Sequence, residues 1–110
     1  MNRVFLVGAG PGDPELLTIR AADLLRRANV VLHDALVPRA ILDLISPTAR
    51  VINIGKRCGQ KLLSQEEINA LLLYFGSTAE TTVRLKGGDP TIFGRAGEEI
   101  AALQDRKSVV

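Results

Sequence analysis

The sequence predicts an α/β domain with a mostly parallel sheet of four to five strands and helices on both faces. Short apolar runs alternate with segments of helical period along the chain, which is the order typical of βαβ units. The first run is continuously apolar and ends in glycines, as expected of a strand buried on both faces. With 110 residues the chain can close one hydrophobic core, so residues 1–110 are expected to form a single domain.

The first strand is expected over residues 4–7, and the helix after it from Pro14 to about Arg27. Asp13 can cap this helix, and proline is tolerated at the first helical position because its missing N–H is not needed there. The apolar positions repeat at helical spacing: Leu17, Ala21, Leu24, Leu25 and Ala28.

The second strand is expected from Val30 to near Asp34, and a short helix from Pro38 through Ile45. Residues 51–54 form a short apolar run that predicts the third strand, which a glycine ends. Ser64 and Glu67 then match a capping box at the start of a helix.

The buried face of that helix is expected to carry Ile68, Leu71, Leu72 and Phe75, and Gly76 is expected to end it. Residues 82–85 are β-branched and apolar and predict a fourth strand. Ile100 and Leu103 mark a last helix, and residues 107–110 are expected to begin a fifth strand.

The composition excludes several classes of protein. Hydrophobic residues make up 46% and charged residues 24% of the chain, and the net charge is +2. No basic run with interleaved aromatics is present, so nucleic acid is not an expected partner. Cys58 is the only cysteine, which excludes an internal disulfide and a paired-cysteine metal site. The N-terminal apolar stretch is too short for a signal peptide or a membrane span, which predicts a cytoplasmic protein without a membrane partner.

Candidate functional residues follow the ends of the predicted strands. Ligands of open parallel sheets bind beyond the carboxyl ends of the strands, so loops distant in sequence converge there. The first loop, G-x-G-x-G over residues 8–12, lacks the spacing of a dinucleotide fingerprint. Asp13 takes the position of its third glycine, where a carboxylate competes with phosphate for the helix N–H groups. A simple turn between strand and helix remains the alternative for this loop.

The other strand ends offer carboxylates, cations and bare backbone. Asp34 directly follows an apolar strand, where carboxylates seldom lie without a partner or a task; the alternative is a helix N-cap. Alternation along the strand points His33 away from Asp34, which favours a core or edge histidine over a base. Lys56 and Arg57 follow the third strand and are either functional or solvated charges.

The fourth strand runs into Gly87, Gly88 and Asp89. The two glycines allow a ligand to approach the backbone closely, and the carboxylate can accept hydrogen bonds from ribose hydroxyls or a ligand ammonium. An adenosyl amino acid fits this description. An ordinary turn closed by Asp-Pro is the alternative.

Taken together, the loops resemble those of the uroporphyrinogen-III C-methyltransferases, within the wider tetrapyrrole methylase family. The motifs that carry the resemblance are V-G-A-G-P-G-D-P-E-L-L-T at 7–18, H-D-A-L-V at 33–37, G-K-R at 55–57 and R-L-K-G-G-D-P-T-I-F-G-R at 84–95. They span nearly the whole chain, and the last motif is highly specific.

The resemblance implies a role for each matched position. It makes Asp34 the proton acceptor and Lys56 the proton donor of a methyl transfer from S-adenosyl-L-methionine, with no metal. Contacts with this cofactor fall on Pro11, Gly87, Gly88, Asp89 and Ile92. Weaker candidates to meet the acidic groups of a tetrapyrrole substrate are Arg57, Lys61 and Arg95. The chain departs from the family at Lys61, where members commonly carry a histidine.

The implied reaction is the C-methylation of uroporphyrinogen III to precorrin-2, on the way to sirohaem or cobalamin. Family members carry a second α/β domain, with the cofactor in the cleft between the two. Without that domain, apolar surface and a sheet edge are left uncovered, so the chain is expected to form a homo-oligomer such as a dimer. The resemblance therefore implies that residues 1–110 are the N-terminal half of such an enzyme and are not active alone. The alternatives are another tetrapyrrole methylase, such as a precorrin methyltransferase, a relative that methylates diphthine or ribosomal RNA, or a non-catalytic folding or dimerising module.

Overall fold

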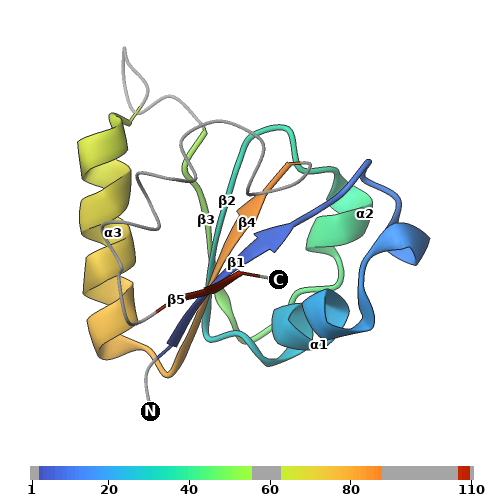
Figure 1. The fold of residues 1–110 in the computed structure, drawn as a ribbon, viewed down its shortest axis with the longest axis horizontal. Helices are drawn as coiled ribbons and strands as arrows, with labels where there is room; N and C mark the ends of the chain where they lie inside the picture. The colour runs from blue at the N-terminus through green and yellow to red at the C-terminus, as the bar shows by residue number, and fades with distance from the viewer. Residues whose placement is uncertain (1–2, 56–62, 88–106, 110) are drawn as a thin grey trace.

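The computed structural model describes residues 3–55, 63–87 and 107–109, which build one parallel sheet (Figure 1). The strand order across the sheet is β3-β2-β4-β1-β5, and every described pairing is parallel. The strands are β1 (Arg3–Gly8), β2 (Val30–His33), β3 (Arg50–Asn53), β4 (Thr81–Lys86) and β5 (Lys107–Val109). The α/β class, the parallel sheet and the fifth strand at Lys107 are thereby confirmed.

Helices cover both faces of the sheet, as predicted. Figure 1 shows α1 (Ile19–Arg27) and α2 (Arg39–Leu42) on one side and α3 (Gln65–Thr78) on the other. Two apolar clusters match these layers because successive strand residues point to opposite faces. The α1 and α2 side buries Phe5, Val7, Leu24, Leu25, Val31, Ile41, Val83 and Leu85, among others. The α3 side buries Val4, Val30, Leu32, Ile54, Leu72 and Phe75.

The predicted helix from Pro14 to Arg27 is wrong in one respect, because it is two helices. A 3₁₀ turn, η1 (Pro14–Leu16), comes first, and α1 starts only at Ile19. Asp13 therefore caps η1, accepting from the Glu15 N–H at 2.9 Å. Thr18 has extended backbone and caps α1, accepting from the Ala21 N–H at 3.0 Å. A side chain that caps a helix must lie outside it, so Thr18 separates the two.

The other helix boundaries differ in detail. The helix expected from Pro38 through Ile45 is only the short α2, for which Pro38 is the N-cap. Gly76 does not end α3, which continues to Thr78. It is buried, and a Cβ built on it would come 2.8 Å from Val4 Cγ2, so the missing side chain allows α3 to lie close to β1. The expected last helix, with Ile100 and Leu103, lies outside the described residues.

The capping box at the start of α3 is confirmed. Ser64 Oγ accepts from the Glu67 N–H at 3.1 Å, and Glu67 Oε1 accepts from the Ser64 N–H at 3.0 Å. Within the described part of the chain, no helix has the length and apolar character needed to cross a membrane.

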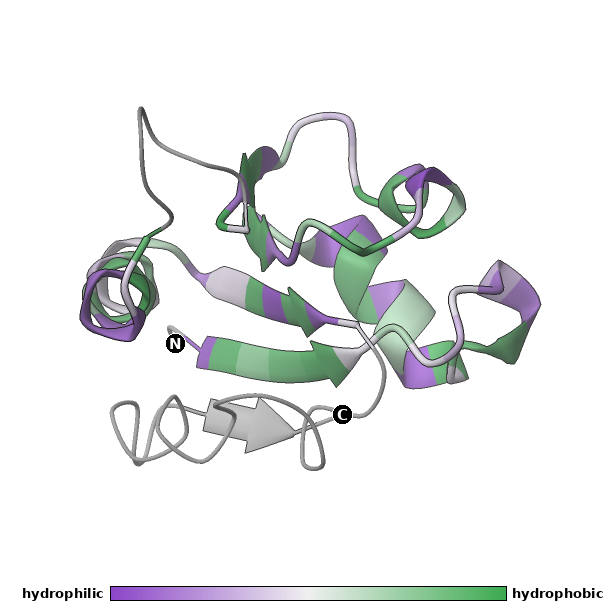
Figure 2. Cartoon of the chain, turned by 90° about the horizontal axis from the view of Figure 1, so that it is seen from above, coloured by the Kyte–Doolittle hydropathy of each residue, from purple (hydrophilic) through white to green (hydrophobic). Residues whose placement is uncertain are grey.

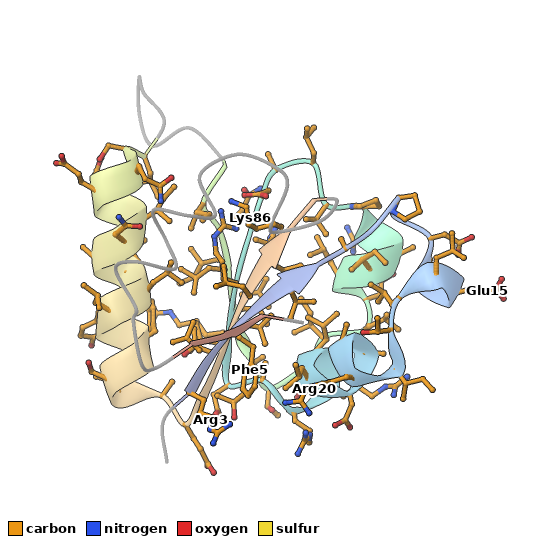
Figure 3. The ribbon with its side chains drawn as sticks, in the orientation of Figure 1. Arg3, Phe5, Glu15, Arg20 and Lys86 are labelled. Carbon is orange, nitrogen blue, oxygen red and sulfur yellow. The ribbon has the colours of Figure 1, made fainter. Side chains whose placement is uncertain are left out.

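The central strand β4 carries a buried polar row that the sequence analysis did not anticipate. Thr82, Arg84 and Lys86 are all buried and alternate with apolar residues that face α1 and α2. The same alternation is visible from above in Figure 2, where the neighbouring β1 is mainly hydrophobic. Lys86 stands at the carboxyl end of β4 (Figure 3). Because these three side chains are buried, their polar groups need hydrogen-bond or charge partners within the protein.

Candidate functional site

The carboxyl ends of β2 and β4 meet where the chain connections diverge. The strands are neighbours, yet the chain continues from β2 towards β3 at one edge of the sheet and from β4 towards β5 at the other. Such a switch in direction is where open α/β sheets bind ligands. A hollow of about 480 Å³ lies here, lined by Ala9, Gly10, Pro11, Gly12, Asp34, Leu36, Pro38 and Gly87. It brings together Pro11, Asp34 and Gly87, which the resemblance had assigned to one site.

Bare backbone forms much of the wall of this hollow. Gly10 has φ +62°, and Gly12 has φ +97°, so both adopt conformations that favour glycine. A Cβ on Gly10 or Gly87 would meet no atom within 4 Å, whereas one on Gly12 would come 2.8 Å from Pro38 Cγ. Gly10 and Gly87 therefore face open space, and Gly12 allows the loop after β1 to lie against Pro38. The loop after β1 thus forms part of the wall of the hollow.

Asp34 is held at the edge of the hollow by two donors from the β4 segment. Its Oδ1 accepts from Arg84 Nη2 at 2.8 Å, and its Oδ2 accepts from the Gly87 N–H at 3.2 Å. The side chain keeps 33% of its surface exposed. Pro38 caps α2 without any side-chain hydrogen bond, so the alternative role of Asp34 as a helix N-cap is wrong. The carboxylate is both oriented and accessible.

Arg84 is the partner that the sequence analysis missed. Its side chain is only 2% exposed, and its Nη1 donates to the Leu85 carbonyl at 3.2 Å. The available signal was the T-V-R-L-K pattern, in which charged residues alternate with apolar ones inside a strand expected to be buried. A buried cation at such a position indicates either a partner or a function.

His33 is a core residue, as its position in the strand suggested. It is 6% exposed, and its Nδ1 lies 2.8 Å from the Asp34 carbonyl oxygen. An N–H on Nδ1 donates to that carbonyl. This contact ties the histidine to backbone at the end of β2 and does not direct it at the Asp34 carboxylate.

The loop after β3 lies directly against the residue that follows Asp34. A Cβ on Gly55 would come 2.5 Å from the Ala35 backbone nitrogen, so only glycine permits this approach. The Ile54 N–H also donates to the His33 carbonyl at 3.0 Å. The remaining site residues of the sequence analysis lie outside the described residues: Lys56, Arg57, Lys61, Gly88, Asp89, Ile92 and Arg95.

The helix starts after β1 are poorly suited to bind a dinucleotide phosphate. Asp13 occupies the Glu15 N–H, and Thr18 occupies the Ala21 N–H. Phosphate binding at a helix start requires such N–H groups and disfavours a carboxylate beside them. Both observations agree with the rejection of the dinucleotide fingerprint on spacing.

Comparison with known proteins gives consistent matches. The family model of tetrapyrrole (corrin/porphyrin) methylases matches residues 3–110. A siroheme synthase of Hahella chejuensis is 56% identical over 104 residues, which cover 94% of this chain and 22% of that protein. A uroporphyrinogen-III C-methyltransferase of Paracoccus denitrificans is 55% identical over 103 residues, covering 94% of this chain and 36% of the relative.

A solved structure matches equally well. The crystal structure of uroporphyrin-III C-methyl transferase from Thermus thermophilus, complexed with S-adenyl homocysteine, superposes with a TM-score of 0.84 at 49% identity. The match covers 98% of this chain and 47% of that structure. The chain thus spans less than half the length of each of these proteins.

Proposed function

The chain belongs to the tetrapyrrole methylase family, and from this membership we propose that it supplies the N-terminal α/β domain of a two-domain enzyme that transfers methyl groups from S-adenosyl-L-methionine to carbon atoms of uroporphyrinogen III. The product is precorrin-2, a precursor of sirohaem and cobalamin. The observation that carries the proposal is the hollow at the ends of β1, β2 and β4, where open glycine backbone meets an oriented carboxylate.

The described residues fit the cofactor. The hollow of about 480 Å³ falls within the range usual for small-molecule sites. Gly10 and Gly87 face open space, so a ligand can approach their backbone groups. We assign Pro11 and Gly87, together with Gly88, Asp89 and Ile92, as cofactor contacts. The bound cofactor supplies an electrophilic methyl group on its sulfonium.

Methyl transfer depends above all on alignment, and rigid backbone at strand ends provides it. Methylation of a ring carbon leaves a proton to be removed, and we assign this task to Asp34. Each of its oxygens accepts one hydrogen bond, and a carboxylate oxygen has a second acceptor position. Because the side chain is 33% exposed at the hollow, that position is accessible.

Residues of the loops after β3 and β4 complete the proposal. Lys56 is assigned as proton donor, and Arg57, Lys61 and Arg95 are assigned to the acetate and propionate groups of the substrate. Guanidinium and ammonium groups suit carboxylates because they form charge-assisted hydrogen bonds. These assignments derive from the motifs that the residues belong to.

The assembly and location of the enzyme are also proposals. Large apolar side chains stand exposed on the described surface: Leu16, Ile19, Leu36, Val51, Leu73 and Tyr74. Such surface favours association, and we propose a homodimer.

We further propose a cytoplasmic location, although one relative, from Arabidopsis thaliana, is named as chloroplastic. Light scattering at micromolar concentration tests the dimer, and a monomer contradicts it.

Methylation of uroporphyrinogen III tests the proposed function. The full-length enzyme that contains this chain is incubated anaerobically with uroporphyrinogen III and methyl-labelled S-adenosyl-L-methionine. Incorporation of two methyl groups, both on carbon, is expected. Absence of label with uroporphyrinogen III, or transfer only to a later tetrapyrrole intermediate, overturns the assignment of substrate.

A further inference from the structure

We propose that Arg84 is a positioning residue, which fixes the carboxylate of Asp34 at the edge of the hollow from inside the sheet. The kinetic consequences of this inference rest on the proposed function, whereas the contact between Arg84 and Asp34 does not depend on it. Arg84 does not line the hollow, so any effect it has on a ligand there must pass through a neighbouring group.

The surroundings of Arg84 explain why its charge is directed to Asp34. In the sheet Arg84 pairs with Leu6 of β1 and Leu32 of β2, both fully buried. A guanidinium among such neighbours is strongly destabilised unless charged or polar groups compensate it. Asp34 Oδ1 provides that compensation at 2.8 Å.

The geometry of the guanidinium restricts its motion. Nη1 donates to the Leu85 carbonyl at 3.2 Å while Nη2 donates to Asp34, so two nitrogens of one planar group are anchored at once. A lysine has a single ammonium and cannot reproduce this fork. The direction of the Nη2 donor is thereby set by the backbone of β4.

Two anchors then define the orientation of the carboxylate. Arg84 holds Oδ1, and the Gly87 N–H holds Oδ2 at 3.2 Å. Both belong to the same stretch of chain, at the end of the central strand. With both oxygens held, the plane of the carboxylate is fixed, and its remaining acceptor positions keep one orientation at the hollow.

The kinetic test compares variants of the full-length enzyme. Arg84→Met removes the charge and keeps an apolar chain, and it is expected to lower kcat about a hundredfold, the cost of misplacing a reacting group by roughly 1 Å. KM for S-adenosyl-L-methionine is expected to stay within about threefold, because ground-state binding does not use the arginine. Arg84→Lys is expected to have a kcat about tenfold higher than that of Arg84→Met, since it restores the charge but not the two-nitrogen geometry of the guanidinium.

Dependence on Asp34 distinguishes positioning from a general structural role. In an Asp34→Asn background, Arg84→Met is expected to cause no further loss of kcat, because the group on which it acts is already disabled. The matched control is Arg27→Met, which breaks an ion pair with Asp23 at 2.7 Å that is largely exposed. This control is expected to keep the parental kcat.

Several outcomes overturn the proposal. A further large loss in the double variant shows that Arg84 acts independently of Asp34, and a raised KM with unchanged kcat shows a binding role. Should Arg84→Met fail to fold, Arg84→Lys decides, and an unchanged kcat in that variant contradicts the need for the fork.

A spectroscopic measurement on the full-length enzyme, made without substrate, separates this inference from the proposed function. The amide proton resonance of Gly87 reports its hydrogen bond to Asp34, and Arg84→Met is expected to shift it while Arg27→Met is not. An unmoved resonance contradicts the positioning role, even when the enzyme proves to methylate a different substrate.

Discussion

Gly76 of α3 lies against Val4 of β1 so closely that a methyl group on the glycine would come 2.8 Å from Val4 Cγ2. Val4 is fully buried, and its β-branched side chain has little rotational freedom. The contact sets how close α3 approaches the sheet. It also yields a prediction in which helix propensity and packing oppose one another.

Gly76→Ala is expected to destabilise the domain by about 1 kcal/mol. The substitution gains about 1 kcal/mol of helix propensity, but overpacking of a buried contact costs about 1–3 kcal/mol. Chemical denaturation measures the free energy of unfolding. In a Val4→Ala background the clash is absent, so Gly76→Ala should then stabilise. Stabilisation in the parental background as well would show that α3 moves outward without cost.

Gly10 and Gly12 form a matched pair in the loop after β1. Both have positive φ, but only Gly12 would place a Cβ against Pro38. Gly10→Ala is expected to cost about 1 kcal/mol of stability for the left-handed conformation alone. Gly12→Ala adds the clash, for a total of about 2–4 kcal/mol. Equal losses in thermal unfolding would contradict the contact with Pro38.

Gly87→Val tests the open face of the cofactor hollow. No atom lies within 4 Å of the position of a Cβ on Gly87, so the fold is expected to lose less than about 0.5 kcal/mol. The new side chain enters the hollow and is expected to weaken binding of S-adenosylhomocysteine to the full-length enzyme at least about tenfold. Calorimetric titration measures this affinity. Ala70→Val, at an exposed position on α3, is the control, and equal affinities in all three proteins would remove Gly87 from the site.

Ser64→Ala removes the cap of α3 and is expected to cost about 1 kcal/mol of stability. The Glu67 N–H then loses its partner at 3.1 Å. Ser46→Ala is the control, because the hydroxyl of Ser46 forms its hydrogen bonds with Thr48 in a turn and not at the start of a helix; it is expected to change stability by less than about 0.5 kcal/mol. Urea denaturation of both variants decides whether the capping box contributes as proposed.

The order of the elements and the strand ends were predictable because their signals are local. Apolar runs, a capping box and glycine loops depend on neighbouring residues, and the hollow then follows from the parallel topology. The features that the sequence did not predict depend on contacts between residues that are distant in sequence. Gly76 resembles a helix end in sequence, and only its contact with Val4 shows why a glycine is needed inside α3. The sequence pattern places Arg84 in a strand but does not indicate its partner, because Asp34 is fifty residues away.

The strand order also has a consequence for the way the chain folds. β4 lies between β1 and β2 in the sheet, so these two early strands do not pair with each other. Leu6 of β1 therefore gains its neighbour in the sheet only when Arg84 of β4 is present. Pairings between segments so distant in sequence close large loops and slow the folding reaction. During synthesis on the ribosome, β1 therefore remains without its β4 partner until the segment Thr81–Lys86 has left the exit tunnel. The sheet therefore cannot form before β4 has been synthesised, and a chaperone that shields apolar segments can act on β1 during this interval.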